Sequence, residues 1–405
     1  MRVIHLVIGS ALTCVVATLG CSESSEQEPS QAQARAQFQS QSETFSERQP
    51  GTTEVRPGQF RAPEFEPPSI LDYRPTSLLV AEENLVPSAK FPVVDIHSHQ
   101  RATAENMEEL IGEMDALNLQ VLVNLSGGSG EALRERVEAV RNGPYPDRFR
   151  LFANVDFSDV GPGFGQEAAA QFQQDIEAGA IGLKVFKSLG MTNLKADGSR
   201  LQVDDPELDP IWEMAGQMNV PVLIHTAEPP AFYEEPDYTN ERWLELALFP
   251  SRRNYGPDQV GFETLLEERD RMFLKHPNTR FIAAHFGFHG HDLQRAAEVL
   301  DSIPNLYLDL SAVLYDFGRQ PRAARDFFIA YQDRLIFGKD SYQPTEFPYY
   351  WRVFETSDEY FDYYRDYHAY WKLYGMDLPD EILRKIYYEN ALAVTPGLPT
   401  TAYGG

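Results

Sequence analysis

The chain has 405 residues, enough for one large single-core domain or two smaller ones. It carries 35 Lys and Arg residues against 61 Asp and Glu residues, which gives a formal net charge of -26 at pH 7. Because so negative a surface repels phosphate backbones, we expect no nucleic-acid partner.

Residues 1–21 are typical of an export signal. Arg2 supplies the positive charge, an apolar run follows, and small residues precede Cys21 in "ATLGC". This ending is similar to a bacterial lipobox, in which the cysteine is lipidated and becomes the first residue of the mature chain. We therefore expect an exported lipoprotein, anchored at Cys21 and facing the periplasm or the cell surface. An uncleaved membrane anchor is the alternative.

Residues 22–62 are predicted to be a disordered tether. They are rich in Ser, Gln and Glu and almost free of aliphatic residues, so they cannot form a core. We expect this tether to hold the domain formed by residues 63–405 away from a membrane, with the lipid anchor as its only membrane contact. The other cysteine, Cys14, lies in the signal, so the mature domain is expected to have no disulfide.

From residue 91 onward, short β-rich runs alternate with amphipathic stretches of helical length. Strands are predicted at residues 93–99, 119–125, 149–157, 180–189, 220–228, 279–287, 306–314 and 334–342. Helices are predicted at residues 104–117, 131–142, 167–179, 208–218, 262–277, 292–302 and 323–333. This order predicts an α/β fold, a (β/α)₈ TIM barrel. A doubly wound open sheet competes, but no Gly-rich fingerprint follows the first strand.

Two segments are longer than a plain barrel requires. Residues 229–260 follow the predicted fifth strand, and residues 342–375, rich in Tyr, Phe and Trp, follow the eighth. Connections of this kind lie over the carboxyl-end face of a barrel, so we expect lids or pocket walls. The alternative for the second segment is that its aromatic side chains only pack against the barrel.

Four of the nine histidines fall near carboxyl ends of predicted strands: His97, His99, His225 and His285. The eighth predicted strand ends in Asp340, and the fourth carries Lys184. His97 and His99 point the same way because strand side chains alternate. Neighbouring imidazoles are costly unless something binds their lone pairs, and a divalent metal does so. His225 and Asp340 lie on strands placed to complete its shell. Imidazole and carboxylate ligands without thiolate suit zinc better than manganese or iron.

Taken singly, these residues also have structural interpretations. His225 would be a hydrogen-bonded core histidine, and Asp340 would cap the following segment. Lys184 would bury its stem and reach solvent. Asp95 is expected to be structural, because its side chain alternates away from the histidine pair.

The ordered set resembles a known pattern: D-x-H-x-H on the first strand, His on the fifth and sixth, and Asp on the eighth. It is the pattern of the amidohydrolase superfamily. "HFG" at 285–287 and "IYYENAL" at 386–392 are similar to its amidohydrolase-related branch, which includes aminocarboxymuconate-semialdehyde decarboxylase. The resemblance runs from about residue 92 to residue 395.

The resemblance implies the metal ligands His97, His99, His225 and Asp340. It gives His285 the role of polarising the substrate or holding the attacking water. Lys184 occupies the strand that carries a carboxylated, metal-bridging lysine in binuclear members. Many members of this branch use one metal, and they are often dimers, so the number of ions and a homodimer stay open.

We therefore expect a metal-dependent hydrolase that acts on a small-molecule amide, lactone or ester. Asp340 would serve as general base and then as general acid, and His285 would stabilise developing negative charge. One alternative is a decarboxylase of a carboxylated unsaturated or aromatic substrate, whose carboxylate Arg101, Lys184 or Lys187 would bind. A second alternative is a non-catalytic, surface-tethered binding barrel.

Overall fold

The computed structural model describes residues 51–401 and 403, and the expected signal and residues 22–50 lie outside them. The chain divides into two units at Pro75 and Thr76. In the first unit, β1 (Thr53–Arg56) pairs antiparallel with β2 (Gln59–Arg61). This hairpin lies inside the span predicted as a disordered tether. Gly58, at φ 74°, closes its turn by donating its N–H to Glu54 Oε1 at 2.7 Å.

The second unit contains a parallel barrel. Its strands lie in two sheet segments, and hydrogen bonds join the edge strands of one segment to those of the other. The strands are β3 (Val93–Ser98), β4 (Leu119–Asn124), β5 (Phe149–Leu151), β6 (Ala153–Asn154), β7 (Leu183–Val185), β8 (Val222–Ile224), β9 (Phe281–Ala283), β10 (Leu306–Asp309) and β11 (Leu335–Ile336). One segment has the order β3-β4-β5 and the other the order β6 to β11. Only Phe152 separates β5 from β6, so these two form one interrupted strand position.

Backbone hydrogen bonds close the ring. Phe152 N–H donates to Asn124 O at 3.0 Å, and Ala153 N–H donates to Gly182 O at 2.8 Å. At the other junction, Ile96 N–H donates to Phe337 O at 3.1 Å, and a parallel bridge joins Ser98 to Asp340. The eight strand positions of the described residues therefore form a closed barrel, and the predicted (β/α)₈ fold is confirmed.

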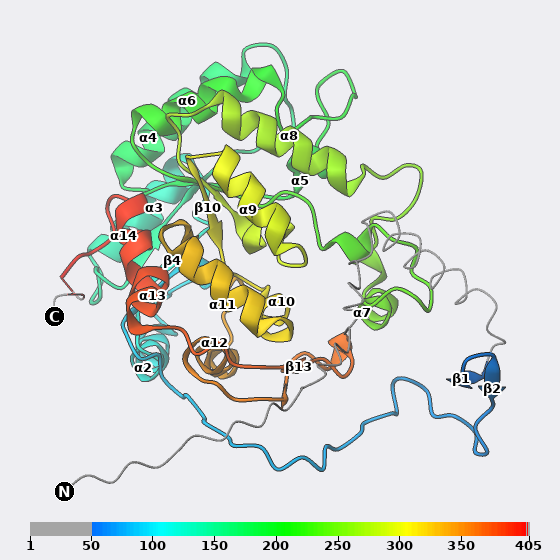
Figure 1. The fold of residues 1–405 in the computed structure, drawn as a ribbon. Coiled ribbons are helices and arrows are strands. Elements are labelled where there is room, and N and C mark those ends of the chain that lie inside the picture. Colours follow the sequence, from blue (N-terminus) through cyan, green and yellow to red (C-terminus); the bar gives the residue numbers. More distant parts are fainter. Residues whose placement is uncertain (1–50, 402, 404–405) are drawn as a thin grey trace, which may run out of the picture. The chain divides into compact units, whose positions relative to one another are not determined.

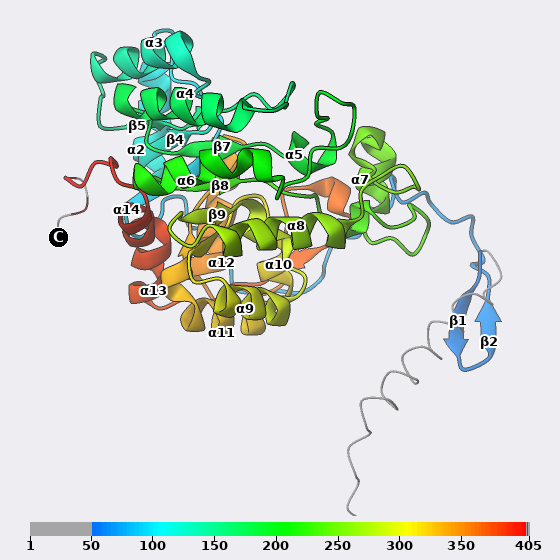
Figure 2. The same ribbon diagram turned by 90° about the horizontal axis from the view of Figure 1, so that it is seen from above.

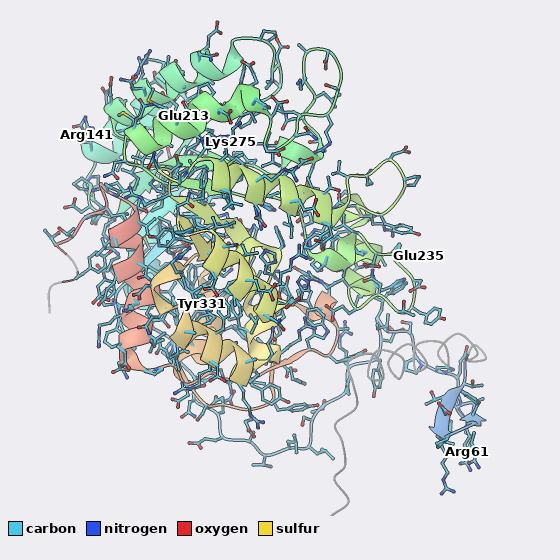
Figure 3. All side chains as sticks on the ribbon, turned by 45° about the horizontal axis from the view of Figure 1, so that its top comes forward. Arg61, Arg141, Glu213, Glu235, Lys275 and Tyr331 are labelled. Atoms are coloured by element: carbon cyan, nitrogen blue, oxygen red, sulfur yellow. The ribbon has the colours of Figure 1, made fainter. Side chains whose placement is uncertain are left out.

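Helices surround the strands (Figure 1), and Figure 2 shows the same arrangement turned by 90°. The longer ones are α2 (Met107–Leu117), α3 (Gly130–Arg141), α4 (Phe164–Ala178), α6 (Asp209–Gln217), α8 (Phe262–Lys275), α9 (Leu293–Ser302) and α11 (Pro321–Ala330). Shorter helices are α5 (Ser188–Met191), η1 (Pro206–Leu208), η4 (Ala284–Phe288), α10 (Leu314–Arg319) and η5 (Gln332–Arg334). Glu213 and Lys275 exemplify the exposed polar faces (Figure 3). No helix of the described residues is both long and apolar enough to span a membrane.

The core has two layers, because the strands are buried on both faces. Inside the barrel, Val94, Ile96, Val121, Leu223 and Ile282 pack together and are at most 1% exposed. A larger apolar cluster fills the space between strands and helices. The strand runs are continuously apolar for this reason.

Both predicted insertions are present. Between β8 and α8 lie η2 (Pro230–Phe232), α7 (Trp243–Leu248) and η3 (Pro250–Arg252). After β11 come η6 (Pro344–Glu346), α12 (Phe347–Glu355), β12 (Phe361–Asp362), η7 (Asp366–His368) and β13 (Lys372–Leu373). The chain ends in α13 (Asp380–Arg384), the π-helical η8 (Lys385–Glu389) and α14 (Asn390–Val394).

The two insertions contact each other through buried polar and aromatic side chains. His368 Nε2 lies 3.3 Å from Glu245 Oε2, and the Arg242 guanidinium lies 5.5 Å from the centre of the Trp371 ring. Tyr350 and Trp351 are fully buried, so many aromatics of the second insertion do pack a core. The insertions therefore form one wall over the carboxyl ends of the strands.

Candidate functional site

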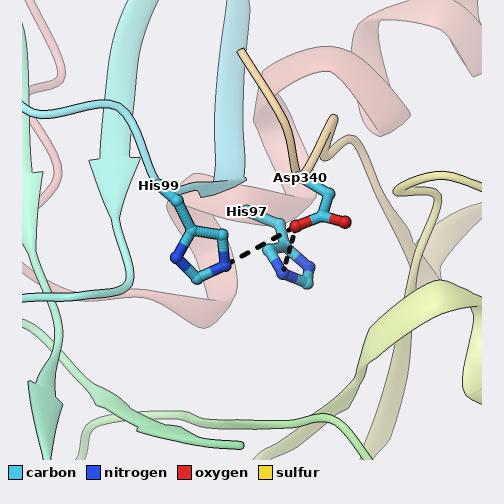
Figure 4. Close-up of side chains that lie close together, drawn as sticks. All are labelled: His97, His99 and Asp340. Carbon is cyan, nitrogen blue, oxygen red and sulfur yellow. Dashed lines mark ion pairs between the residues drawn. The ribbon is translucent and has the colours of Figure 1, made fainter. Parts of the chain in front are cut away.

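Three predicted ligands converge where β3 ends and where the segment that follows β11 reaches Asp340. Asp340 Oδ1 lies 3.7 Å from His97 Nε2 and 3.6 Å from His99 Nε2 (Figure 4). The three donor atoms all lie within 4.8 Å of one another. His97 comes from β3, and His99 follows its last residue, as the strand alternation predicts.

The other nitrogen of each ring is already engaged. His97 Nδ1 lies 2.8 Å from Asp309 Oδ2, and His99 Nδ1 lies 2.8 Å from Ser126 Oγ. Because His97 Nδ1–H donates to a carboxylate, its Nε2 carries the lone pair. Burial lowers the pKa of His97 below its ordinary value and that of His99 to about 4. Both rings are therefore neutral at pH 7, the form that binds a metal.

Asp340 supplies an anionic oxygen to the group. Burial raises the pKa of this carboxyl, but the neighbouring His97 and His285 lower it more strongly, so it stays below the ordinary value. The carboxylate is thus ionised at pH 7. Two imidazole nitrogens and one carboxylate oxygen, aimed at one point, fit a divalent cation.

His225 and His285 form a second, adjacent pair. His285 Nε2 lies 3.2 Å from His225 Nδ1, and the ring centres are 4.4 Å apart. The outer nitrogens face carbonyl oxygens, Ser311 O at 2.9 Å and Ala227 O at 3.1 Å, so both must donate. If both rings are neutral, two lone pairs face each other. Such an arrangement needs a proton or another cation nearby, which agrees with a cation site.

His225 does not belong to the close group of three. Its two nitrogens point at His285 and at Ala227, while Lys184 is the residue beside His97. Lys184 lies on β7 and places its Nζ 3.2 Å from His97 Nε2. Burial lowers the pKa of this lysine to about 8, although Asp309 and Asp340 raise it.

Asp309, at the end of β10, was missed by sequence reasoning. It is fully buried, and its Oδ1 accepts hydrogen bonds from His285 N at 2.9 Å, Ser311 N at 3.0 Å and Ser311 Oγ at 2.5 Å. Oδ2 accepts from His97. His97, His285 and Asp309 also offer three donor atoms within 4.8 Å. Because its oxygens already accept four hydrogen bonds, we interpret Asp309 as the residue that orients His97. It is the only acidic residue of the run 306–314, which was the available signal.

The other residues considered in the sequence do not belong to the group of His97, His99 and Asp340. The side chain of Arg101 is exposed and does not line the cavity described below. Lys187 lines that cavity and pairs with Glu228. Asp95 is fully buried, and its Oδ1 accepts from the N–H groups of His97 at 3.1 Å and Lys339 at 3.0 Å, which ties β3 to the strand of β11.

Residues with positive φ gather at the carboxyl ends of the strands. They are Ala227 (71°), His285 (57°), Phe286 (59°), Phe288 (58°), Ala312 (57°) and Asp340 (76°). Non-glycine residues rarely adopt this conformation, and such strain is typical of functional sites. His285, Phe288, Ala312 and Asp340 line one cavity of about 210 Å³ together with His225. This volume is below the ~300–1,000 Å³ of sites for drug-sized ligands, so a small molecule fits.

A closed eight-stranded barrel with this donor set at the carboxyl ends of its strands is a metal-dependent enzyme. The chain belongs to the amidohydrolase family, whose profile matches residues 143–395. The match begins after His99, so the first-strand histidines rest on the geometry alone. The predicted amidohydrolase membership is confirmed.

Several solved structures are similar to this chain. An uncharacterised TIM-barrel protein from Bordetella bronchiseptica is 17% identical, with a TM-score of 0.47, and covers 75% of this chain and 98% of its own. A dihydroxybenzoic acid decarboxylase from Polaromonas sp., solved with manganese and 2-nitroresorcinol, is 14% identical, with a TM-score of 0.47. The match covers 75% of this chain and 96% of the decarboxylase. A 4-oxalomesaconate hydratase from Rhodopseudomonas palustris is 14% identical, with a TM-score of 0.47. The match covers 76% of this chain and 96% of the hydratase. None of the curated proteins compared with the chain matches it.

Proposed function

We propose that this protein is a hydrolase that cleaves a small-molecule amide, lactone or ester with the help of one divalent cation. The observation that carries the proposal is the convergence of His97 Nε2, His99 Nε2 and Asp340 Oδ1 within 4.8 Å of one another. These three residues would hold the metal, and His225 is the candidate for a fourth ligand. Nitrogen and carboxylate donors favour zinc, with manganese and iron as alternatives.

When bound, the metal supplies the Lewis acidity that makes water a nucleophile near neutral pH. Asp340 lines the cavity with its ionised carboxylate. It is therefore placed to take a proton from the attacking water and to pass it to the leaving group.

We propose a narrower role for His285 than the resemblance implied. Its Nδ1–H donates to Ser311 O, so the neutral ring has its lone pair on Nε2. A lone pair accepts a hydrogen bond and cannot donate one. We therefore assign His285 to holding the attacking water, rather than to polarising the substrate.

The variant His285→Asn tests this assignment. We expect the metal content to stay at the wild-type level, while turnover falls about 10²-fold, because the attacking water loses a group that orients it. Elemental analysis measures the metal, and hydrolysis of a panel of amides, esters and lactones measures turnover. Loss of metal would make His285 a ligand instead.

The same panel separates the alternative functions. Carboxylated aromatic compounds are added, and release of CO₂ is measured beside hydrolysis. CO₂ release without hydrolysis would replace the proposal with a decarboxylase. A protein that takes up no metal and turns over nothing would be a binding barrel.

We also propose that the enzyme is exported and held at a membrane by a lipid on Cys21. Only the sequence of residues 1–21 supports this proposal. The predicted tether, residues 22–62, would then set the distance between the enzyme and the membrane.

A further inference from the structure

Charged side chains line the cavity that contains His225, His285 and Asp340. The cationic ones are Lys187, Arg242, Arg252 and Arg365, and the carboxylates are Glu228, Glu245 and Asp340. Four cations thus face three carboxylates, before any metal is added. A divalent cation would make the cavity still more positive, although the chain as a whole is strongly acidic.

Each carboxylate that lines the cavity already has a partner. Glu228 forms an ion pair with Lys187. Glu245 accepts from Arg242 Nε at 2.7 Å and also pairs with Arg252. Asp340 faces the two histidines of the metal group. No carboxylate in the lining of the cavity is left to pair with the fourth cation.

That cation is Arg365, in the insertion after β11. It is half-buried, and no Asp or Glu among the residues that the structure describes forms an ion pair with it. Its guanidinium lies 5.5 Å from the centre of the Tyr364 ring, and its carbonyl accepts from His368 N–H at 3.0 Å, which orders the backbone. Arg365 lines the cavity, and no carboxylate of the described residues neutralises its charge, so an anion that enters the cavity would meet an unpaired guanidinium.

We propose that Arg365 binds a carboxylate group of the substrate, so that the hydrolase acts on small amides, lactones or esters that carry one carboxylate. The hydrolytic reaction in this proposal rests on the proposed function. The binding of the carboxylate by Arg365 does not depend on it and can be tested separately. One unpaired cation matches one negative charge, and the planar guanidinium fork matches a carboxylate through two parallel hydrogen bonds. Arg365 and Asp340 line the same small cavity. The carboxylate would therefore lie at one end of the substrate and the bond to be cleaved at the other.

Other cations of the site fit this role less well. Arg101 is exposed and does not line the cavity, while Lys187, Arg242 and Arg252 are paired within the wall. Lys184 is directed at His97. Arg365 alone combines a place on the wall with an unpaired charge among the described residues.

The test uses benzoate and its neutral analogue benzamide as probes of the full-length protein. Binding of each is measured by calorimetry, for metal-loaded and for metal-free protein, because benzoate can also bind a metal directly. Wild type should prefer benzoate in both forms. Arg365→Gln should weaken benzoate binding about 10- to 100-fold and leave benzamide binding unchanged, while Arg365→Lys keeps part of the preference. The control is Arg134→Gln, on the outer helix α3.

Metal content and the thermal midpoint are measured for every variant, so a folding defect is recognised, and Arg365→Lys then carries the test. Benzoate binding that Arg365→Gln does not weaken would overturn the proposal. So would tighter binding of phenyl phosphate than of benzoate, which would replace the carboxylate with a phosphate. If the carboxylate preference depends on Arg365 but no panel compound is hydrolysed, the anion subsite stands and the hydrolase proposal fails.

Discussion

Replacing Asp309 by Asn tests how the structure prepares His97 for a metal. The carboxylate is fully buried and accepts one hydrogen bond on Oδ2, from His97, and three on Oδ1, from His285 and Ser311. An amide has one accepting oxygen and one donating NH₂ group. The less unfavourable orientation keeps the oxygen toward the three donors and turns the NH₂ group toward His97 Nδ1.

His97 must then respond to a donor in place of an acceptor. The ring can accept on Nδ1 only by moving its proton to Nε2, the atom that faces His99 and Asp340. The lone pair for the metal is lost in that tautomer. Changes in such supporting residues weaken metal binding about 10- to 100-fold, which corresponds to about 1.4 to 2.8 kcal/mol.

The matched control is Ser126→Ala, which removes the corresponding partner of His99. Ser126 is exposed, and its hydrogen bond joins two neutral groups, so water can replace the hydroxyl. We expect a loss of zinc affinity below about tenfold for this variant. Competition with a chromophoric chelator measures both affinities, and the thermal midpoint of the metal-free protein shows whether each variant is folded. A folded Asp309→Asn protein that binds zinc as tightly as wild type would refute the role of Asp309.

Three further predictions concern the lysine, the insertions and the N-terminus. Lys184→Gln should leave one ion per chain in elemental analysis, because a single-ion site does not need a bridging lysine; a fall from two ions to one would contradict this. Burial raises the pKa of Glu245, but hydrogen bonds from His368 and Arg242 lower it more strongly, to about 2. Its stabilising effect is therefore present above the unfolded pKa of about 4.5 and is lost as the pH falls through about 2. Glu245→Gln should reduce the free energy of unfolding by about 3 kcal/mol at pH 7 in urea titrations, and a deficit that does not shrink from pH 5 to pH 3 would count against this pairing. Cys21→Ser should move the protein from the membrane fraction to the soluble fraction of cells, and unchanged membrane association would point to an uncleaved anchor.

The barrel and the convergence of the first-strand histidines with Asp340 could be predicted from sequence. Both follow from strand alternation and from the rule that carboxyl ends of parallel strands share one face. The residues at which the strands end were predicted less accurately. The run 279–287 looks continuous, yet β9 stops at Ala283 because His285 and Phe286 adopt positive φ, which no hydrophobic pattern encodes.

The residues that sequence reasoning missed depend on tertiary contacts. Asp309 stands alone in an apolar strand, and only the fold brings it to His97, which lies 212 residues away along the chain. Arg365 lies in an insertion whose contacts no periodicity describes. The hairpin at residues 53–61 was missed because polar composition outweighed a Pro-Gly turn signal. For Asp309 and Arg365, the local pattern was therefore less informative than long-range packing.

The most direct measurement is the metal content of the full-length protein after loading with zinc and removal of free ions, compared with a His97→Ala/His99→Ala double variant. The two imidazoles and Asp340 should retain one zinc ion per wild-type chain, and the folded double variant should retain none. A wild-type protein that holds no ion, or a double variant that holds as much zinc as wild type, would contradict the metal centre from which the proposed chemistry follows.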